Sequence, residues 1–318
     1  MKIAVVGCGA VGSYYGALLS RAGEDVHFLL RSDYSVVRQN GVHIHSPRGD
    51  FTARPQAAVA PEEIGPSNLV VIALKTTANA AFARLLPPLV GPQTALLTLQ
   101  NGLGNEVALA QLFPRNPIFG GLCFVCVNRL APGVIQHLDH GLIMLGEFQR
   151  PSSTRLHEVA AVFQRAEIVC RVADDLARAH WEKLVWNIPF NGLGVASAAG
   201  YDALITTTEN MAVKQPCRTT DQLLDGGRWE ILVRELMLEV IAAANALGHQ
   251  LEGGLAAKMI ERTRTMGAYK ASTVLDFEHG RSLELESLFL EPLRQAQAAG
   301  VSVPRLTVLC RLLERLNP

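Results

Sequence analysis

Long hydrophobic runs, an excess of either charge and aromatic residues are all missing or scarce in this 318-residue sequence. No uninterrupted stretch of about 20 apolar residues occurs, so the sequence predicts no membrane-spanning helix. Basic and acidic residues number 29 each, so the formal net charge is zero and nothing favours nucleic acid or an anionic membrane as a partner. Aromatic residues make up 6% against a hydrophobic fraction of 49%, so the cores are expected to be mainly aliphatic.

Groupings of cysteine and histidine that hold a metal are also missing. One CxxC occurs, with no second pair and no histidine beside it, so we predict buried thiols on a strand rather than a zinc site. The paired histidines lack helical ligand spacing, and we expect them on the surface or on edge strands. We therefore predict no metal and no histidine base, in a reducing, cytoplasmic setting. These residues are Cys123 and Cys126, His43 and His45, and His137 and His140.

Alternating strand and helix signals dominate the first half of the chain. The apolar runs 2–6, 25–30, 69–74 and 95–99 are typical of buried parallel strands, with helical stretches between several of them. This order predicts an α/β fold with a doubly wound parallel sheet. Residues 118–146 contain several short strand-like pieces, which we expect at the far edge of that sheet.

Helical periodicity replaces this pattern from about Pro151. We therefore divide the chain into two domains, a nucleotide-binding domain at 1–175 and an all-helical domain at 176–318. Gly200–Arg228 is mixed in character and is expected to be an irregular connection. The helices are expected at 181–199, 229–247, 255–266, 272–279 and 283–299.

A glycine-rich turn follows the first strand and opens a helix. It reads Gly7-Cys8-Gly9-Ala10-Val11-Gly12, the GxGxxG pattern of Rossmann-type dinucleotide sites. The first glycine permits the tight turn, the second lets the backbone approach a pyrophosphate, and the third lets helix and strand pack closely. The N–H groups and the positive dipole at the helix N-terminus then favour phosphate.

The end of the second strand indicates which dinucleotide binds. NAD sites place an acidic residue there to accept hydrogen bonds from the ribose 2′-OH, whereas NADP sites need a cation for the 2′-phosphate. Arg31 stands at this strand end, about 20 residues beyond the glycines, and Asp33 two residues later is the competing candidate. We favour NADPH as the cofactor.

Two further polar residues follow strands at the edge where ligands bind in open α/β sheets. Lys75 comes directly after the strand at 69–74, and Asn101 follows the strand at 95–99. Asn101-Gly102 is also a turn signal, so from position alone Asn101 is equally a turn residue or a contact for nicotinamide or substrate.

Two polar clusters stand out in the helical half. Lys183, Asn187 and Asn191 recur every four residues and would share one face of an otherwise apolar helix, which Pro189 is expected to kink. Ser272 and Asp276 are likewise four apart. Gly280 is expected to end that helix and Ser282 to cap the next, which would place Glu284 in its first turn.

Taken in order, these pieces resemble the ketopantoate reductase family over nearly the whole chain. Each of the short motifs behind the resemblance is weak alone, but their order and spacing together are specific to the family. They are Gly7–Gly12, Arg31, Leu74-Lys75, Gln100-Asn101-Gly102, Lys183-Leu184 with Asn187 and Asn191, and Ser272, Asp276, Gly280-Arg281 and Glu284.

The resemblance implies NADPH-dependent reduction of 2-dehydropantoate to pantoate, on the route to pantothenate. Lys183 matches the family's general acid, and Glu284 matches an acidic residue that binds the substrate hydroxyl. Ser272 matches a residue that holds the substrate carboxylate. The remaining matches are Arg31 and Lys75 to the 2′-phosphate pair, and Asn101, Asn187 and Asn191 to polar residues lining the cleft.

Departures from the family pattern keep other functions open. Tyr269 stands where the family often has asparagine, and Leu285–Leu290 departs from its usual continuation after the matched glutamate. The alternatives are a reductase of another 2-keto acid, a related hydroxyacid or polyol-phosphate dehydrogenase, and an NADP-binding regulator without catalysis. The helical half also offers a candidate apolar face for a homodimer.

Overall fold

The computed structural model describes residues 1–205 and 215–318. The chain divides into two compact units, Met1–Leu176 and Ala177–Pro318. The expected irregular connection at Gly200–Arg228 lies partly outside the described residues. Its described part contains two short helices, η4 (Tyr201–Leu204) and α8 (Thr220–Leu223).

The first unit is built on one mixed, ten-stranded sheet. Six neighbouring strands, in the order β5-β2-β1-β6-β7-β8, run parallel, and β9 and β4 are each antiparallel to a neighbour. The sheet continues from β8 through β9 and β3 to β4, and β10 also pairs with β9. The strands are β1 (Lys2–Val6), β2 (Asp25–Leu29), β3 (Val42–His45), β4 (Phe51–Ala53), β5 (Gln56–Ala58), β6 (Leu69–Ile72), β7 (Ala95–Thr98), β8 (Ile118–Ala131), β9 (Val134–Glu147) and β10 (Cys170–Val172).

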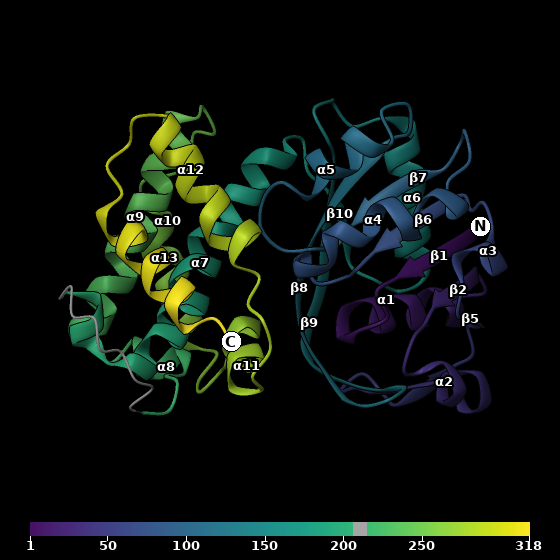
Figure 1. The fold of residues 1–318 in the computed structure, drawn as a ribbon, viewed down its shortest axis with the longest axis horizontal. Coiled ribbons are helices and arrows are strands. Elements are labelled where there is room, and N and C mark those ends of the chain that lie inside the picture. The colour runs from purple at the N-terminus through teal and green to yellow at the C-terminus, as the bar shows by residue number, and fades with distance from the viewer. Residues whose placement is uncertain (206–214) are drawn as a thin grey trace. The chain divides into compact units, whose positions relative to one another are not determined.

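Alternate residues of the central strands are buried in two different cores, which explains their continuous apolar runs. In β1, Ile3 and Val5 belong to one core, while Ala4 and Val6 belong to the other. Helices cover both faces, as the predicted doubly wound fold requires (Figure 1). The first core is closed by α1 (Ala10–Arg21) and α6 (Thr154–Arg165), and the second by α3 (Pro61–Ile64), α4 (Phe82–Leu85), η2 (Pro87–Leu89) and α5 (Asn105–Leu112).

Residues 118–146 differ from the expectation of several short strands at the far edge of the sheet, because β3 and β4 lie beyond β9. β8 and β9 form one antiparallel hairpin of two 14-residue strands, bent by register shifts at Phe124/Val125, Cys126/Val127 and Arg129/Ala131. The shifts explain why the sequence reads as broken pieces, because each bulge interrupts the alternation of side chains. Cys123 and Cys126 lie on β8 as thiols, the first half-buried and the second buried.

Every element of the second unit within the described residues is a helix, so the predicted fold class is confirmed. The sequence did not lead us to expect the last one, α13, although its buried leucines recur at helical spacing. The helices are α7 (Leu176–Ala196), η3 (Ser197–Ala199), η4, α8, α9 (Arg228–Ala246), α10 (Leu255–Arg264), α11 (Ser272–Glu278), the π-helical η5 (Glu286–Leu290), α12 (Glu291–Ala298) and α13 (Pro304–Leu316). The first unit also contains α2 (Tyr34–Asn40) and η1 (Thr76–Ala81).

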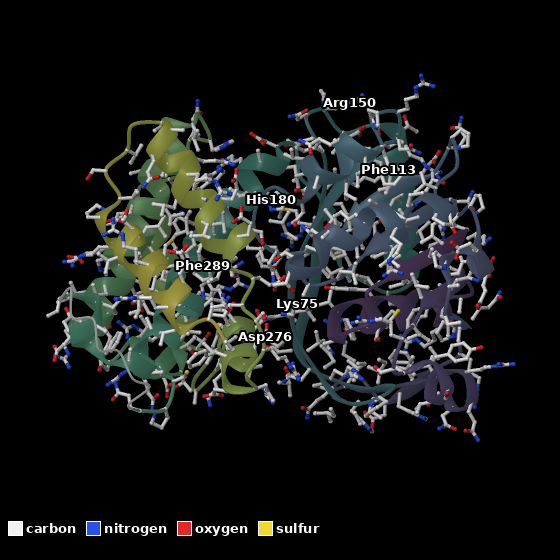
Figure 2. All side chains as sticks on the ribbon, viewed as in Figure 1. Lys75, Phe113, Arg150, His180, Asp276 and Phe289 are labelled. Atoms are coloured by element: carbon white, nitrogen blue, oxygen red, sulfur yellow. The ribbon has the colours of Figure 1, made fainter. Side chains whose placement is uncertain are left out.

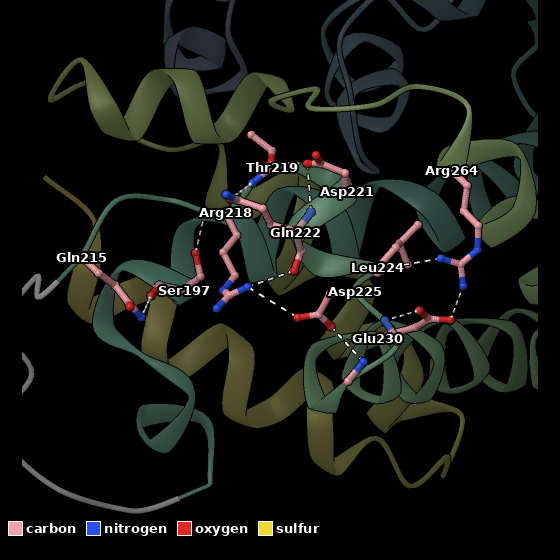
Figure 3. A network of polar contacts seen from close by, with 12 residues as sticks. Ser197, Gln215, Arg218, Thr219, Asp221, Gln222, Leu224, Asp225, Glu230 and Arg264 are labelled. Atoms are coloured by element: carbon pink, nitrogen blue, oxygen red, sulfur yellow. Dashed lines mark hydrogen bonds and ion pairs between the residues drawn. The ribbon is translucent and has the colours of Figure 1, made fainter.

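A polar network joins the end of α7 to the helices that follow it (Figure 3). The Ser197 hydroxyl accepts a hydrogen bond from the backbone N–H of Arg218, whose guanidinium donates to the Gln222 carbonyl and pairs with Asp225. Arg264 of α10 donates to the Leu224 carbonyl and forms an ion pair with Glu230 of α9. These contacts hold α8 between α7, α9 and α10 in this unit.

One histidine prediction is wrong. His137 of β9 is 3% exposed, not a surface residue. Its Nδ1 lies 2.9 Å from the Ser46 hydroxyl, and its ring packs at a tilt against that of Tyr14 of α1, at a centroid distance of 4.6 Å. The strand bends at His140, which has a positive φ, and the His140 carbonyl lies 3.2 Å from His137 Nε2. Strand alternation alone does not reveal such a bend.

No helix within the described residues is both long and apolar enough to cross a membrane.

The buried position of His137 makes stability depend on pH. Burial lowers the pKa of His137, because the imidazolium loses hydration there. A base with a lowered pKa in the folded state stabilises the protein above its unfolded pKa of about 6.5, and this stability is lost as the pH falls below that value. The loss is at most about 1.4 kcal/mol per pH unit, until the folded pKa is reached.

We expect the free energy of unfolding to fall more steeply between pH 7 and pH 5 in the natural protein than in His137→Gln. Urea unfolding across this range measures it, and His157→Gln, a substitution on the solvent side of α6, is the control. Equal slopes for the natural protein and His137→Gln would contradict this account.

Candidate functional site

The glycine turn between β1 and α1 is shaped by contacts that exclude side chains. Gly7 has φ of 99°, and a Cβ there would lie 2.3 Å from the backbone nitrogen of Leu74. A Cβ on Gly12 would lie 2.3 Å from the Gly7 carbonyl oxygen. Both glycines are therefore required for the turn to pack against the end of β6. At Gly9 a Cβ would meet nothing within 4 Å, so this part of the turn faces open space.

This open side of the turn fits a phosphate group. Gly9 is the N-cap of α1, and the exposed backbone and the positive end of the helix dipole lie together there. Cys8, Ala10 and Val11 complete the turn. Burial raises the pKa of Cys8 well above its usual value, so the thiol stays protonated and adds no charge beside a bound phosphate.

The end of β2 separates the two candidate ribose ligands. Asp33 is 6% exposed, and its carboxylate accepts a hydrogen bond from Arg129 Nε at 2.9 Å and one from the Gly133 N–H at 3.3 Å. Burial acts to raise the pKa of Asp33, but hydrogen bonds from Arg129 and Ser32 outweigh it and lower the pKa. Asp33 is thus committed to holding the tip of the β8–β9 hairpin, whereas Arg31 is exposed at the strand end.

Lys75 and Asn101 lie at the carboxyl ends of adjacent parallel strands. Lys75 is exposed, follows β6 and is the N-cap of η1; Figure 2 labels it. Asn101 is half-buried and follows β7, which pairs in register with β6. Because β1, β6 and β7 are neighbours, the glycine turn, Lys75 and Asn101 share one edge of the sheet.

The polar stripe of the second unit lies on α7. The helix continues through Pro189, with Lys183 half-buried, Asn187 7% exposed and Asn191 2% exposed. Asn191 uses both ends of its amide. Its Nδ2 donates to the Asn187 carbonyl at 3.0 Å, and its Oδ1 accepts from the backbone N–H of Thr273 at 3.0 Å.

The contact with Thr273 ties α7 to the start of α11, which carries Ser272. Ser272 is the exposed first residue of α11, and Thr273 is buried behind it. Asn191 and Thr273 are 82 positions apart, so no local sequence pattern indicates that Asn191 anchors this helix. The contact between this buried amide and the start of α11 can be recognised only in the folded structure.

The segment after α11 departs from the expected capping. Gly280 has φ of 64° and follows the last residues of α11, as predicted. Ser282, however, is not the next N-cap. Helical hydrogen bonding begins with the Glu284 carbonyl, which accepts from the Leu288 N–H, and Asn317 after α13 instead accepts from the Leu283 N–H at 2.8 Å. Glu284 is 5% exposed at this helix start.

Asp276 is the other buried carboxylate of this region. It is 5% exposed, and its Oδ1 lies 3.6 Å from Arg281 Nη1; Figure 2 labels Asp276. Arg281 also donates its backbone N–H to the Asp276 carbonyl, so the arginine of the Gly280-Arg281 pair is held against α11. Among the described residues, no group of three acidic, histidine or cysteine side chains is placed to hold a metal ion.

Comparisons with known proteins agree on one family. Residues 3–150 match the family model described as "Ketopantoate reductase PanE/ApbA", and residues 212–317 match the model of its C-terminal part. A 2-dehydropantoate 2-reductase of Nostoc sp. is 39% identical, with 99% of this chain and 95% of the relative covered.

Solved structures show the same likeness. A 2-dehydropantoate 2-reductase of Geobacter metallireducens is 47% identical, covers 99% of each chain and has a TM-score of 0.89. A ketopantoate reductase of Staphylococcus aureus, described as dimeric, shares the fold at 17% identity and a TM-score of 0.78, with 99% and 98% of the two chains covered. The chain therefore belongs to the ketopantoate reductase family of NADP-dependent oxidoreductases.

Proposed function

We propose that the protein reduces 2-dehydropantoate to pantoate with NADPH, a step of pantothenate biosynthesis. One observation carries the proposal. A chain of this family combines an open glycine turn and an exposed Arg31 with the polar stripe of Lys183 on α7. We assign cofactor binding to residues 1–175 and the substrate-binding and catalytic role to residues 176–318. A cytoplasmic location is part of the same proposal.

The proposed cofactor residues form three groups. The backbone of Gly7–Gly12 holds the pyrophosphate, Arg31 and Lys75 pair with the 2′-phosphate, and Asn101 contacts the nicotinamide end. Arginine suits the 2′-phosphate because its guanidinium donates to two phosphate oxygens at once. NADPH, when bound, supplies the hydride that is added to the keto carbon.

Lys183 is the proposed general acid. Its ammonium group donates a proton to the keto oxygen as the hydride reaches the carbon, and its positive charge stabilises the negative charge that develops on that oxygen. The lysine is left neutral and takes a proton from water before the next turnover. The alcohol and the oxidised cofactor are the products.

We propose four substrate-binding residues and one positioning residue. Ser272 holds the substrate carboxylate, Asn187 and Asn101 orient the keto acid, and Glu284 accepts a hydrogen bond from the substrate hydroxyl. For Asn191 we propose an indirect role, because both ends of its amide are already engaged. It positions Ser272 by fixing the start of α11.

A different 2-keto acid is the second candidate substrate. The Tyr269 ring lies 6.4 Å from that of Trp186, which in turn lies 4.9 Å from Phe190. Tyr269 is one of the departures from the family pattern, and its ring and that of Trp186 would match a keto acid with an aromatic side chain. A panel of keto acids assayed beside 2-dehydropantoate distinguishes the two.

A homodimer is also part of the proposal. Ile231 and Leu238 of α9 are 58% and 48% exposed, and they lie two turns apart on one face of the helix. A contact with a second copy about a two-fold axis would remove both side chains from water. The S. aureus protein described as dimeric shares this fold.

Replacing Lys183 with alanine tests the general acid. We expect kcat to fall by about 10²- to 10⁴-fold, the usual contribution of general acid catalysis, with the affinity for NADPH unchanged. Loss of NADPH absorbance in the presence of 2-dehydropantoate measures the rate, and Glu182→Ala, at the exposed neighbouring position, is the control. A Lys183→Ala enzyme with a normal kcat would refute the assignment.

Replacing Arg31 with alanine tests cofactor choice. We expect the KM for NADPH to rise about tenfold to a hundredfold, because one charge-assisted contact to the 2′-phosphate is lost. The KM for NADH should not change, since NADH lacks that phosphate. Arg38→Ala, an exposed arginine of α2, is the matched control, and an equal rise for both cofactors would sink the 2′-phosphate role.

The double substitution Ile231→Glu, Leu238→Glu tests the dimer. We expect the mass measured by light scattering after size exclusion to drop from that of two chains to that of one, because charges would face each other across the interface. Leu130→Glu, at an equally exposed position of β8, should leave the mass unchanged. A natural protein that is monomeric at all concentrations would rule the interface out.

A further inference from the structure

A chain of side-chain amides links the loops that follow β6 and β7. The Thr98 hydroxyl donates to Gln100 Oε1 at 3.0 Å, and Gln100 Nε2 donates to Asn79 Oδ1 at 2.7 Å. Asn79 Nδ2 donates to Asn105 Oδ1 at 3.0 Å, and Asn105 Nδ2 donates to the Asn101 carbonyl at 3.1 Å. We call these four bonds the amide relay.

The relay is largely buried and consistently oriented. Thr98, Gln100 and Asn105 are each at most 5% exposed, whereas Asn79 is half-buried. Each amide accepts one bond with its oxygen and donates one with its nitrogen, so all four bonds point the same way along the chain. Aligned amides polarise one another, which favours the intact relay over a partly broken one.

The relay connects elements that carry two proposed cofactor residues. Asn79 lies in η1, whose N-cap is Lys75, and Asn105 is the first residue of α5, directly after the loop of Asn101. That loop contains Gly102 and Gly104, both with positive φ. Gly102 and Gly104 permit several conformations of this loop, and the bond from Asn105 to the Asn101 carbonyl favours the one observed.

We propose that Gln100, Asn79 and Asn105 are positioning residues that couple the 2′-phosphate end of the cofactor site to its nicotinamide end. The proposal rests on the function proposed above. When the 2′-phosphate engages Lys75, the position of η1 is fixed, and the relay transmits this constraint to Asn101. Binding energy from a remote part of the cofactor then contributes to orienting the reacting end.

Two substitutions break the relay at different points. Asn79→Ala removes both bonds of η1 to the relay. Asn105→Asp is nearly identical in shape and keeps the oxygen that accepts from Asn79, but it cannot donate to the Asn101 carbonyl. The helix dipole at the first position of α5 offsets part of the cost of burying this carboxylate, and the melting temperature of each variant shows that it is folded before it is assayed.

The control is Asn116→Ala. Asn116 is also a partly buried amide with two hydrogen bonds, to the carbonyls of Gly91 and Thr94, but these lie before β7 at the opposite edge of the sheet. Its loss should lower the melting temperature without changing cofactor binding or turnover. Any general effect of removing a structural amide will therefore show in this variant.

The experiment combines titration calorimetry of NADP⁺ and NAD⁺ with steady-state kinetics of the full-length protein. We expect Asn105→Asp to lower kcat about tenfold or more with little change in the Kd of NADP⁺, because only the nicotinamide end is misplaced. We expect Asn79→Ala to lower kcat and also to raise the Kd of NADP⁺ but not that of NAD⁺. A loss of stability alone would not change kcat in one variant and both kcat and the Kd of NADP⁺ in the other.

The opposite results overturn the coupling. If Asn105→Asp keeps its kcat, or if Asn79→Ala weakens NADP⁺ and NAD⁺ equally, the relay is only structural. Absence of turnover of any keto acid by the natural protein would instead count against the proposed function. In that case the Kd of NADP⁺ for Asn79→Ala still shows whether the relay contributes to binding of the 2′-phosphate.

Discussion

The close approach of the glycine turn to the end of β6 is the constraint on which the first unit depends. The Gly7 backbone lies where a Cβ would meet Leu74 at 2.3 Å, so β1, α1 and the β6 end are fixed relative to one another. Lys75 follows Leu74 directly, and β6 sets the register of β7 and hence the position of Asn101. This backbone contact and the pairing of β1, β6 and β7 together set the geometry of the edge at which we place the cofactor.

Much of this arrangement was predictable from the sequence, and for a physical reason. A strand buried on both faces is almost entirely apolar, so β1, β6 and β7 stand out as continuous runs. β3, β4, β5 and β10 are short and each contains a polar residue, so they do not form such runs, and the register shifts in β8 and β9 hid a long hairpin. The helix expected at 283–299, with Ser282 as its N-cap, begins after Glu284 instead.

The site was predictable as a set of residues, but not in its connections. Sequence alone left Arg31 and Asp33 as competing ribose ligands, because position after a strand is the same signal for both. Arg129 distinguishes them. It lies 96 residues beyond Asp33, and its guanidinium donates a hydrogen bond to the Asp33 carboxylate. Asn191 shows the same limit, since its partner Thr273 is close only in the fold. Long-range hydrogen bonds of this kind carry no local sequence signal.

The pairing of β3 with β9 has a consequence for how the protein is made. His43, Ile44 and His45 take Val134, Ile135 and Gln136 as sheet partners, and Asp33 takes Arg129. On a ribosome, the strand at residues 42–45 emerges long before its neighbour is synthesised, and one of its edges has no backbone partner in the meantime. Contacts so distant in sequence close late and slowly. The first unit must therefore complete its sheet in one late event, and chains truncated before residue 134 would present an unpaired strand edge prone to aggregation.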